Sequence, residues 1–151
     1  MLAVLAALVR AGARFKVVGG VALNLHGIVR STEDLDLFVD PDPENVRRVV
    51  AALREVYADP QLDEIRPDDL GGEYPAIQYV PPDGGFSIDL LSRLGEAFRY
   101  DDVECVTATV EGLAIQLATP RMLYRMKRDT VRPQDQADAA RLKHRFKLED
   151  P

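Results

Sequence analysis

The hydrophobic pattern of this 151-residue chain switches repeatedly between the period of a strand and the period of a helix. Alternating or continuous apolar residues predict strands over residues 14–18, 35–39, 76–80, 86–91, 103–110 and 113–117. Helical spacing predicts helices before Gly12 and over residues 21–26, 43–57, 120–129 and 134–146. This mixture indicates a single α/β (or α+β) domain, with helices packed against a mixed, partly antiparallel sheet.

Two helix starts carry clear capping signals. Asp42 is expected to cap a helix that begins with Pro43 in its first turn. The buried face of that helix is predicted to carry Val46, Val49, Val50, Leu53 and Val56. Thr119 and Pro120 repeat the cap-and-proline signal, whereas residues 59–74 are rich in Pro, Asp and Gly and are expected to form an irregular connection.

Composition narrows the class of protein. Hydrophobic residues make up 46% of the chain and charged residues 29%, which is ordinary for a globular domain and excludes wholesale disorder. The single cysteine, Cys105, excludes a disulfide framework and a Cys-rich zinc site. No apolar run reaches the ~20 residues of a membrane span, and Arg10 follows the first apolar stretch, whereas a signal peptide has its basic residues before it. A cytoplasmic protein is therefore expected.

The charge is unevenly distributed along the chain. The formal net charge is −6, yet residues 121–147 hold nine basic and only three acidic residues. The acidic remainder argues against a protein that coats nucleic acid. The basic segment could hold a polyanion such as RNA, or it could be a solvated helix face, and both interpretations stay open.

Gly19 and Gly20 separate a predicted strand from a predicted helix. Glycines at such a turn let a phosphate approach the backbone, where the N–H groups of a helix start are unpaired. Strand-to-helix turns also use glycine for purely structural reasons. The glycine pair is therefore a weak signal by itself.

Three aspartates on predicted strands indicate a metal site. Asp34 and Asp36 are two residues apart on one strand, so both carboxylates project from the same face. Asp89 lies among apolar residues on another strand, where an unpaired carboxylate is costly. Oxygen-only ligands favour Mg²⁺ or Mn²⁺ over zinc, and two such ions can hold an attacking and a leaving oxygen in line on phosphorus. A solvated sheet edge and a structural hydrogen bond of Asp89 are the alternatives.

Taken together, Gly19-Gly20, Asp34-Leu35-Asp36 and Asp89 resemble the signature of the nucleotidyltransferase superfamily related to DNA polymerase beta. Residues 18–37 look closest to the small branch that includes the abortive-infection toxin nucleotidyltransferases. Residues 123–127 and 132–138 resemble the helical Lys and the Arg-Pro-Lys-Asp-x-x-Asp element of that branch. The resemblance implies a nucleotidyltransferase domain over residues 1–151, with a helical tail at about residues 120–147.

The resemblance also implies roles for the residues that match. Asp34, Asp36 and Asp89 would be the catalytic residues and metal ligands, and the nucleotide phosphates would lie on Gly19, Gly20 and Lys127. A solvated helix lysine is the alternative for Lys127. Many superfamily members carry serine where this chain has Gly20, so phosphate contacts there must come from backbone N–H groups or another side chain.

Three further residues are supporting candidates. Arg30 is expected to pair with a carboxylate, which is a structural role. Asp138 would orient the acceptor or Lys127, whereas Asp135 is explained equally well as an acid at a helix N-terminus. Gln134 stands where the branch usually has Lys, which removes one candidate contact to a phosphate or an acceptor.

The expected function is metal-dependent transfer of a nucleoside monophosphate from an NTP, ATP among the candidates, to an acceptor hydroxyl. The cofactor would be Mg²⁺ or Mn²⁺, and the acceptor an RNA end, a protein side chain or a small molecule. The resemblance also implies a toxin with an antitoxin partner. The alternative is a non-catalytic member of the fold that binds a nucleotide or a partner.

Overall fold

The computed structural model describes residues 1–72 and 74–150, and it contains the predicted mixture of helices and strands. The helices are α1 (Leu2–Arg10), α2 (Gly19–Leu25), α3 (Pro43–Val56), α4 (Pro120–Lys127) and α5 (Pro133–Phe146), with short 3-10 helices η1 (Pro60–Glu64) and η2 (Tyr100–Asp102). The strands are β1 (Phe15–Val18), β2 (Asp34–Val39), β3 (Ala76–Tyr79), β4 (Ser87–Leu91), β5 (Arg93–Leu94), β6 (Phe98–Arg99), β7 (Cys105–Val110) and β8 (Leu113–Ala118).

Six strands of the described chain form one sheet in the order β3-β4-β2-β1-β8-β7. β1 runs antiparallel to β2 and parallel to β8, while β2 runs parallel to β4. β3 and β7 pair antiparallel with β4 and β8 and form the two edges. The sheet is therefore mixed, and the α/β fold class expected from the pattern is confirmed.

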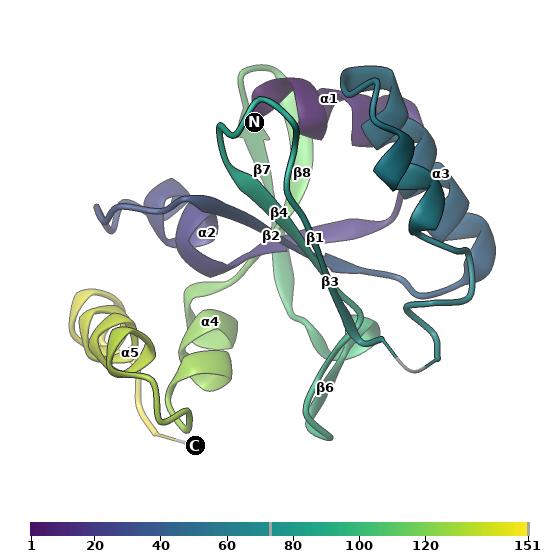
Figure 1. Cartoon of the computed structure of the whole chain (residues 1–151). Coiled ribbons are helices and arrows are strands. Elements are labelled where there is room, and N and C mark those ends of the chain that lie inside the picture. The colour runs from purple at the N-terminus through teal and green to yellow at the C-terminus, as the bar shows by residue number, and fades with distance from the viewer. Residues whose placement is uncertain (73, 151) are drawn as a thin grey trace.

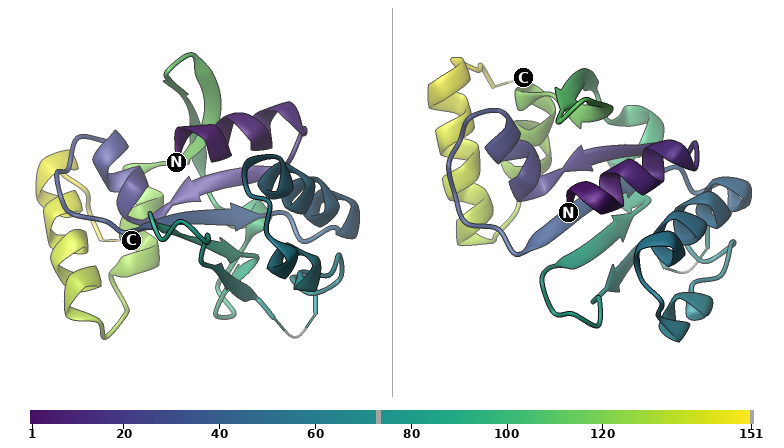
Figure 2. Two further views of the ribbon diagram at one scale, coloured as in Figure 1. Left: turned by 45° about the horizontal axis from the view of Figure 1, so that its top comes forward. Right: turned by 90° about the horizontal axis from the view of Figure 1, so that it is seen from above.

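The two faces of the sheet differ in polarity. Leu35, Leu37 and Val39 of β2 are fully buried in the core, to which the apolar faces of α1 and α3 also belong. Asp34 and Asp36 point from the other face of the same strand. Helices α4 and α5 lie together at the end of the sheet away from α3 (Figures 1 and 2). This arrangement leaves the acidic face of β2 open toward the C-terminal helices.

Glycine ends the first helix as predicted. Gly12 has φ +69°, the left-handed conformation that glycine adopts without strain. The Gly12 N–H donates to Val9 O at 3.1 Å and the Ala13 N–H donates to Leu8 O at 3.1 Å, which is the hydrogen-bond pattern of a Schellman motif. The chain then turns directly into β1.

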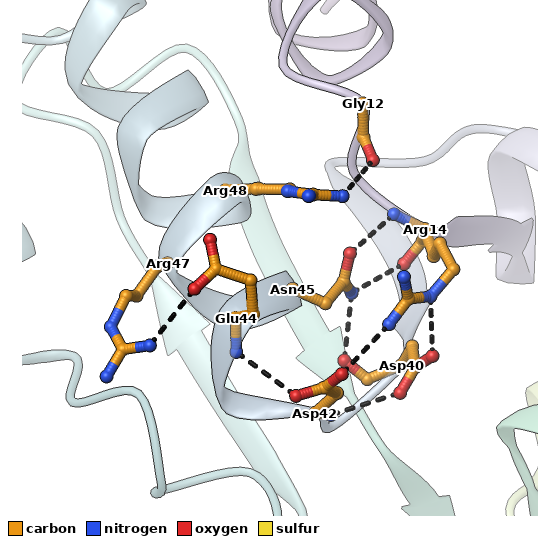
Figure 3. A network of polar contacts seen from close by, with 8 residues as sticks. All are labelled: Gly12, Arg14, Asp40, Asp42, Glu44, Asn45, Arg47 and Arg48. Atoms are coloured by element: carbon orange, nitrogen blue, oxygen red, sulfur yellow. Dashed lines mark hydrogen bonds and ion pairs between the residues drawn. The ribbon is translucent and has the colours of Figure 1, made fainter.

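A polar network joins the start of α3 to the ends of β1 and β2 (Figure 3). The Asp42 side chain accepts a hydrogen bond from Glu44 N at 3.2 Å, so the predicted cap is confirmed. Asn45 is fully buried; it accepts from Arg14 N at 2.7 Å and donates to the carbonyls of Arg14 and Asp40 at 3.0 and 2.9 Å. Of the predicted apolar face of this helix, Val46, Val49, Val50 and Leu53 are buried and Val56 is partly buried.

Differences from the predicted elements are small. The second helix begins at Gly19, two residues earlier than expected, and the strand predicted from residue 103 begins at Cys105 because η2 precedes it. The short β5–β6 hairpin was not predicted. Thr119 caps α4 by accepting from Met122 N at 3.1 Å, and both predicted C-terminal helices are present. Among the described residues, no helix has the length and apolar character needed to cross a membrane.

Candidate functional site

The parallel pairing of β2 with β4 places two aspartates side by side. Asp36 lies directly opposite Asp89, and Asp34 lies directly opposite Ser87. Residues that are opposite each other in a ladder point to the same face of a sheet, so Asp36 and Asp89 form a facing carboxylate pair. Val18 of β1 and Gln78 of β3 continue the same row on either side.

The carboxylate pair is electrostatically strained. Burial, followed by a hydrogen bond shared with Asp89 and the negative charge of Asp89, raises the pKa of Asp36 to about 7. Among the described residues, the buried Oδ1 of Asp89 has no hydrogen-bond partner. A buried acceptor without a donor is costly, so this atom is suited to a cation or to a proton from a substrate.

Asp34 has a different partner from the pair. Its Oδ1 accepts a short hydrogen bond from the Ser87 hydroxyl, which lies opposite it on β4. In the described part of the chain, no group of three or more His, Cys, Asp or Glu side chains is arranged to hold a metal ion. The two carboxylates of Asp36 and Asp89, with the orphaned oxygen, nevertheless fit a hard cation such as Mg²⁺ or Mn²⁺, which takes oxygen ligands.

The two glycines of the turn after β1 have different surroundings. Gly19 has φ +69°, and a Cβ there would overlap the carboxyl group of Asp36. A Cβ on the buried Gly20 would instead lie 2.8 Å from Thr32 Oγ1 and 3.2 Å from Arg30 Cζ. Gly19 therefore faces the carboxylates, whereas Gly20 lets α2 pack against the loop that precedes β2.

Lys127, at the end of α4, is part of a buried ionic cluster. Its Nζ donates to Asp138 Oδ2 at 3.0 Å and to Asp135 Oδ1 at 3.2 Å. Asp138 is fully buried and also receives an ion pair from Arg30 at 3.4 Å and a hydrogen bond from Gln134 Nε2 at 3.2 Å. The expected carboxylate partner of Arg30 is thus Asp138, and Gln134 supports that same carboxylate.

Asp135 is more than an acid at a helix start. Burial alone would raise its pKa, but the hydrogen bond from the Thr130 hydroxyl at 2.9 Å and the charge of Lys127 lower the pKa below its usual value. The carboxylate is therefore ionised and committed to Thr130 and Lys127. The solvated-lysine alternative for Lys127 is wrong, because that residue is only 9% exposed.

A cavity of about 430 Å³ brings the two groups together. One wall, formed by β2, β4 and the start of α2, contains Gly19, Asp36 and Asp89, and a second wall, formed by α4 and α5, contains Lys127 and Asp135. The rest of the lining is Val18, Ala76, Ile77, Gln78, Leu91, Leu94, Leu123, Met126, Thr130 and Arg132. In the described structure, four of the sequence candidates do not line this cavity: Gly20, Asp34, Arg30 and Asp138. Asp138 pairs with Lys127, which does line it, and Asp34 accepts a hydrogen bond from Ser87. Gly20 follows Gly19 and lies close to Arg30.

Sequence reasoning missed Ser87, Gln78 and Thr130, and it gave no role to Arg132, the first residue of the element over residues 132–138. Ser87 and Gln78 could have been found from the strand register, because each lies directly opposite an aspartate, Asp34 and Asp89 respectively. Thr130 and Arg132 lie in the connection between α4 and α5 and have no periodic signal. Their place in the cavity depends on how the C-terminal helices pack.

Comparison with protein families identifies the chain. Residues 3–117 match the family model described as "Nucleotidyl transferase AbiEii toxin, Type IV TA system". The match includes both glycines and all three strand aspartates, while α4 and α5 lie beyond it. No curated protein matches the chain. The match covers most of the chain and agrees with the mixed sheet and the facing carboxylates, so the chain belongs to the AbiEii family of nucleotidyltransferase toxins of type IV toxin–antitoxin systems.

Proposed function

We propose that this chain transfers a nucleoside monophosphate from an NTP to an acceptor hydroxyl, with Mg²⁺ or Mn²⁺ as cofactor. The observation that carries the proposal is the carboxylate pair of Asp36 and Asp89 in one cavity with Gly19 and Lys127. Carboxylates next to a glycine turn can hold a metal-bound polyphosphate, and a lysine on the other wall can neutralise the negative charge of its phosphates.

In the proposed reaction, the acceptor oxygen forms a bond to the α-phosphorus of the NTP. The bond from that phosphorus to the oxygen bridging to the β-phosphate breaks, and pyrophosphate leaves with the electron pair. Asp89 accepts the proton of the acceptor hydroxyl at its orphaned Oδ1. Bound cations, held by Asp34, Asp36 and Asp89, would neutralise the charge that develops on the phosphates.

The nucleotide phosphates are proposed to lie between the two walls of the cavity. The backbone of Gly19 lines one wall and accepts no side chain there, because a Cβ would overlap Asp36. Lys127 faces the cavity from the other wall, held in place by Asp135 and Asp138. Gly20 contributes indirectly by letting α2 pack closely against Thr32.

The acceptor is an RNA end, a protein side chain or a small molecule. Of the basic residues between 121 and 147, most are exposed, which suits contact with RNA phosphates. Arg141 is partly committed, since it donates to Val29 O at 2.9 Å, and Lys143 pairs with Asp150 at 2.9 Å.

We propose an antitoxin as the macromolecular partner, as the family description implies.

The non-catalytic alternative rests on the orientation of Asp34, which is turned to Ser87. A protein that binds NTP without turnover would need the cavity but not three converging carboxylates. On the proposed function, Asp34 would join Asp36 and Asp89 as a metal ligand, and its hydrogen bond with Ser87 would compete with that role.

The deciding experiment is incubation with α-labelled NTPs and Mg²⁺ or Mn²⁺, in the presence of total cellular RNA or of a protein extract. We expect label in one of these fractions, together with pyrophosphate in equal amount. Asp89→Asn should abolish both, whereas the matched exposed-surface variant Asp68→Asn should not. NTP binding without pyrophosphate release or labelling under any condition would favour the non-catalytic alternative.

A further inference from the structure

The short hairpin β5–β6 carries two arginines that face each other. Arg93 of β5 lies directly opposite Arg99 of β6, so both side chains project from the same face of the hairpin. Like charges that lie directly opposite each other destabilise a strand pair. This hairpin has only two residues in each strand, and an isolated hairpin gains little stability from its own pairing. Strand pairing therefore does not favour two arginines at these positions.

The two arginines line a second cavity of about 290 Å³, which we call the arginine cavity. It shares no lining residue with the cavity that holds the carboxylate pair. Leu94, the neighbour of Arg93 on β5, instead lines the cavity of the carboxylate pair. Successive residues of a strand point to opposite faces, so the hairpin lies between the two cavities and presents its cationic face to the arginine cavity.

The carboxylates of the arginine cavity do not balance this charge. Asp40 and Asp101 line the cavity, but Asp40 is already paired with Arg14 Nε at 2.6 Å. Asp101 is exposed. Within residues 1–72 and 74–150, neither Arg93 nor Arg99 forms an ion pair with a carboxylate. Two guanidinium groups thus stand against a single uncommitted carboxylate, which leaves the cavity positive.

The surroundings of the arginine cavity add a further cation and fix its walls. Lys16 Nζ donates to Tyr100 O at 2.6 Å and lies 4.1 Å from the centre of the Tyr100 ring, and Tyr100 lines the cavity. Ser92 and Leu70 line it as well, and the buried Ser92 hydroxyl donates to Leu70 O at 2.6 Å. Exposed guanidinium groups on fixed backbone segments suit the capture of an anion.

We propose that the arginine cavity binds a phosphate group, held between the guanidinium groups of Arg93 and Arg99. A guanidinium presents parallel N–H donors that match two phosphate oxygens. An anion between two facing cations also replaces their repulsion by attraction. This inference does not depend on nucleotidyl transfer, because the NTP phosphates are proposed to lie in the other cavity.

The phosphate group has two sources of the same chemistry, a free phosphate ion and a phosphate within an oligonucleotide. Asp89 and Arg93 are four residues apart in the chain, so their Cα atoms are separated by at most about 14 Å. A longer molecule that carries a phosphate in the arginine cavity can therefore extend to the carboxylate pair. The experiment distinguishes the two sources.

The test compares Arg93→Gln/Arg99→Gln with Arg47→Gln/Arg48→Gln, which removes the same charge from exposed positions of α3 that line neither cavity. Inorganic phosphate is titrated into each protein by calorimetry at constant ionic strength. Loss of charged hydrogen bonds should weaken phosphate binding at least about tenfold in Arg93→Gln/Arg99→Gln and leave the control variant like the wild type. Affinity for Mg²⁺-loaded NTP should be equal in the two variants, because the other cavity is unchanged.

A short oligouridylate provides the second arm, with its affinity measured by fluorescence anisotropy over a range of salt concentrations. The log–log salt slope should become flatter by about 0.7 for each phosphate contact that the arginine variant loses. A change in both arms supports a phosphate within a chain, whereas a change with inorganic phosphate alone supports a free ion as the ligand.

The melting temperature in chloride checks the folded state. Arg93→Gln/Arg99→Gln should melt no lower than the control variant, because a repulsive pair has been removed. If it melts lower, Arg99→Lys replaces it, since lysine keeps the charge but not the fork and should bind phosphate severalfold more weakly than wild type. Wild-type phosphate affinity and wild-type salt slope in the folded arginine variant would overturn the proposal.

Discussion

Replacing Asp36 by asparagine should stabilise the metal-free protein at neutral pH. The folded protein holds the pKa of Asp36 at about 7, against 3.8 for the unperturbed group. Between pH 3.8 and about 7, Asp36 therefore keeps its proton in the native state and has lost it in the unfolded state. The free energy of unfolding falls as pH rises through this window. At ~1.36 kcal/mol per pKa unit, the ionisation of Asp36 lowers the free energy of unfolding at pH 8 by about 4 kcal/mol. This is a large part of the total free energy of unfolding of a typical protein, which is about 5–15 kcal/mol.

The assay is urea unfolding of wild type and Asp36→Asn in the presence of a chelator, from pH 4 to pH 8. We expect the two free energies of unfolding to be similar near pH 4 and the variant to be more stable by up to about 4 kcal/mol at pH 8. Asp68→Asn, which changes an exposed carboxylate, should follow the wild type at every pH. Parallel curves for wild type and Asp36→Asn would refute the reasoning, because the strain of the carboxylate pair would then be absent.

Divalent metal should narrow the difference in stability between Asp36→Asn and the wild type at pH 8. A cation held at 100 times its Kd stabilises the native state by about 2.7 kcal/mol. The wild type should gain this amount in Mg²⁺ or Mn²⁺ at pH 8, and Asp36→Asn should gain much less. An unchanged melting temperature of the wild type in millimolar metal, with and without NTP, would count against a metal site.

Three further substitutions test the remaining parts of the site. Ser87→Ala should change the affinity for Mg²⁺ or Mn²⁺, measured by calorimetry, by about tenfold, because Asp34 loses its hydrogen bond. Ser87→Thr keeps the hydroxyl and should stay near the wild-type affinity. Equal affinities of all three proteins would contradict a role of Ser87 in holding Asp34. Gly19→Ala should lower the free energy of unfolding by at least about 1–3 kcal/mol, because residue 19 has a positive φ. It should also weaken metal binding, because the added Cβ displaces Asp36. A variant with the wild-type urea midpoint and metal affinity would show that the turn tolerates a side chain. Asp138→Asn leaves buried cations without a full partner and should lower the unfolding free energy by about 3–5 kcal/mol; a loss below about 1 kcal/mol would mean that water solvates the cluster.

Most of the fold could be predicted from the sequence because the signals are local. Asp42, Thr119 and Gly12 stand at helix ends, and each does in the structure what its residue type favours. The spacing of Asp34 and Asp36 likewise fixed their common face. The β5–β6 hairpin escaped prediction because its strands have two residues each, too few to show a period.

The candidate site was predictable only in part, because its geometry depends on contacts between distant segments. The opposition of Asp36 and Asp89 requires the parallel register of β2 and β4, which no local pattern determines. Lys127 was expected to contact phosphates, with a solvated lysine as the alternative, and its burial against Asp138 depends on the packing of α5. Gly20 was expected to admit phosphates, but the space beside it is taken by Thr32 and Arg30.

The two walls of the cavity are made at different times. Asp138, which anchors the cationic wall, leaves the ribosome 102 residues after Asp36. At roughly 5–20 residues per second, the acidic wall waits about 5–20 s for its counterpart. On the proposed function, a nascent toxin cannot clamp a triphosphate between both walls until its last helix has been synthesised and has docked. The order of the chain thus separates the synthesis of the acidic wall from the synthesis of the wall that is proposed to hold the phosphates.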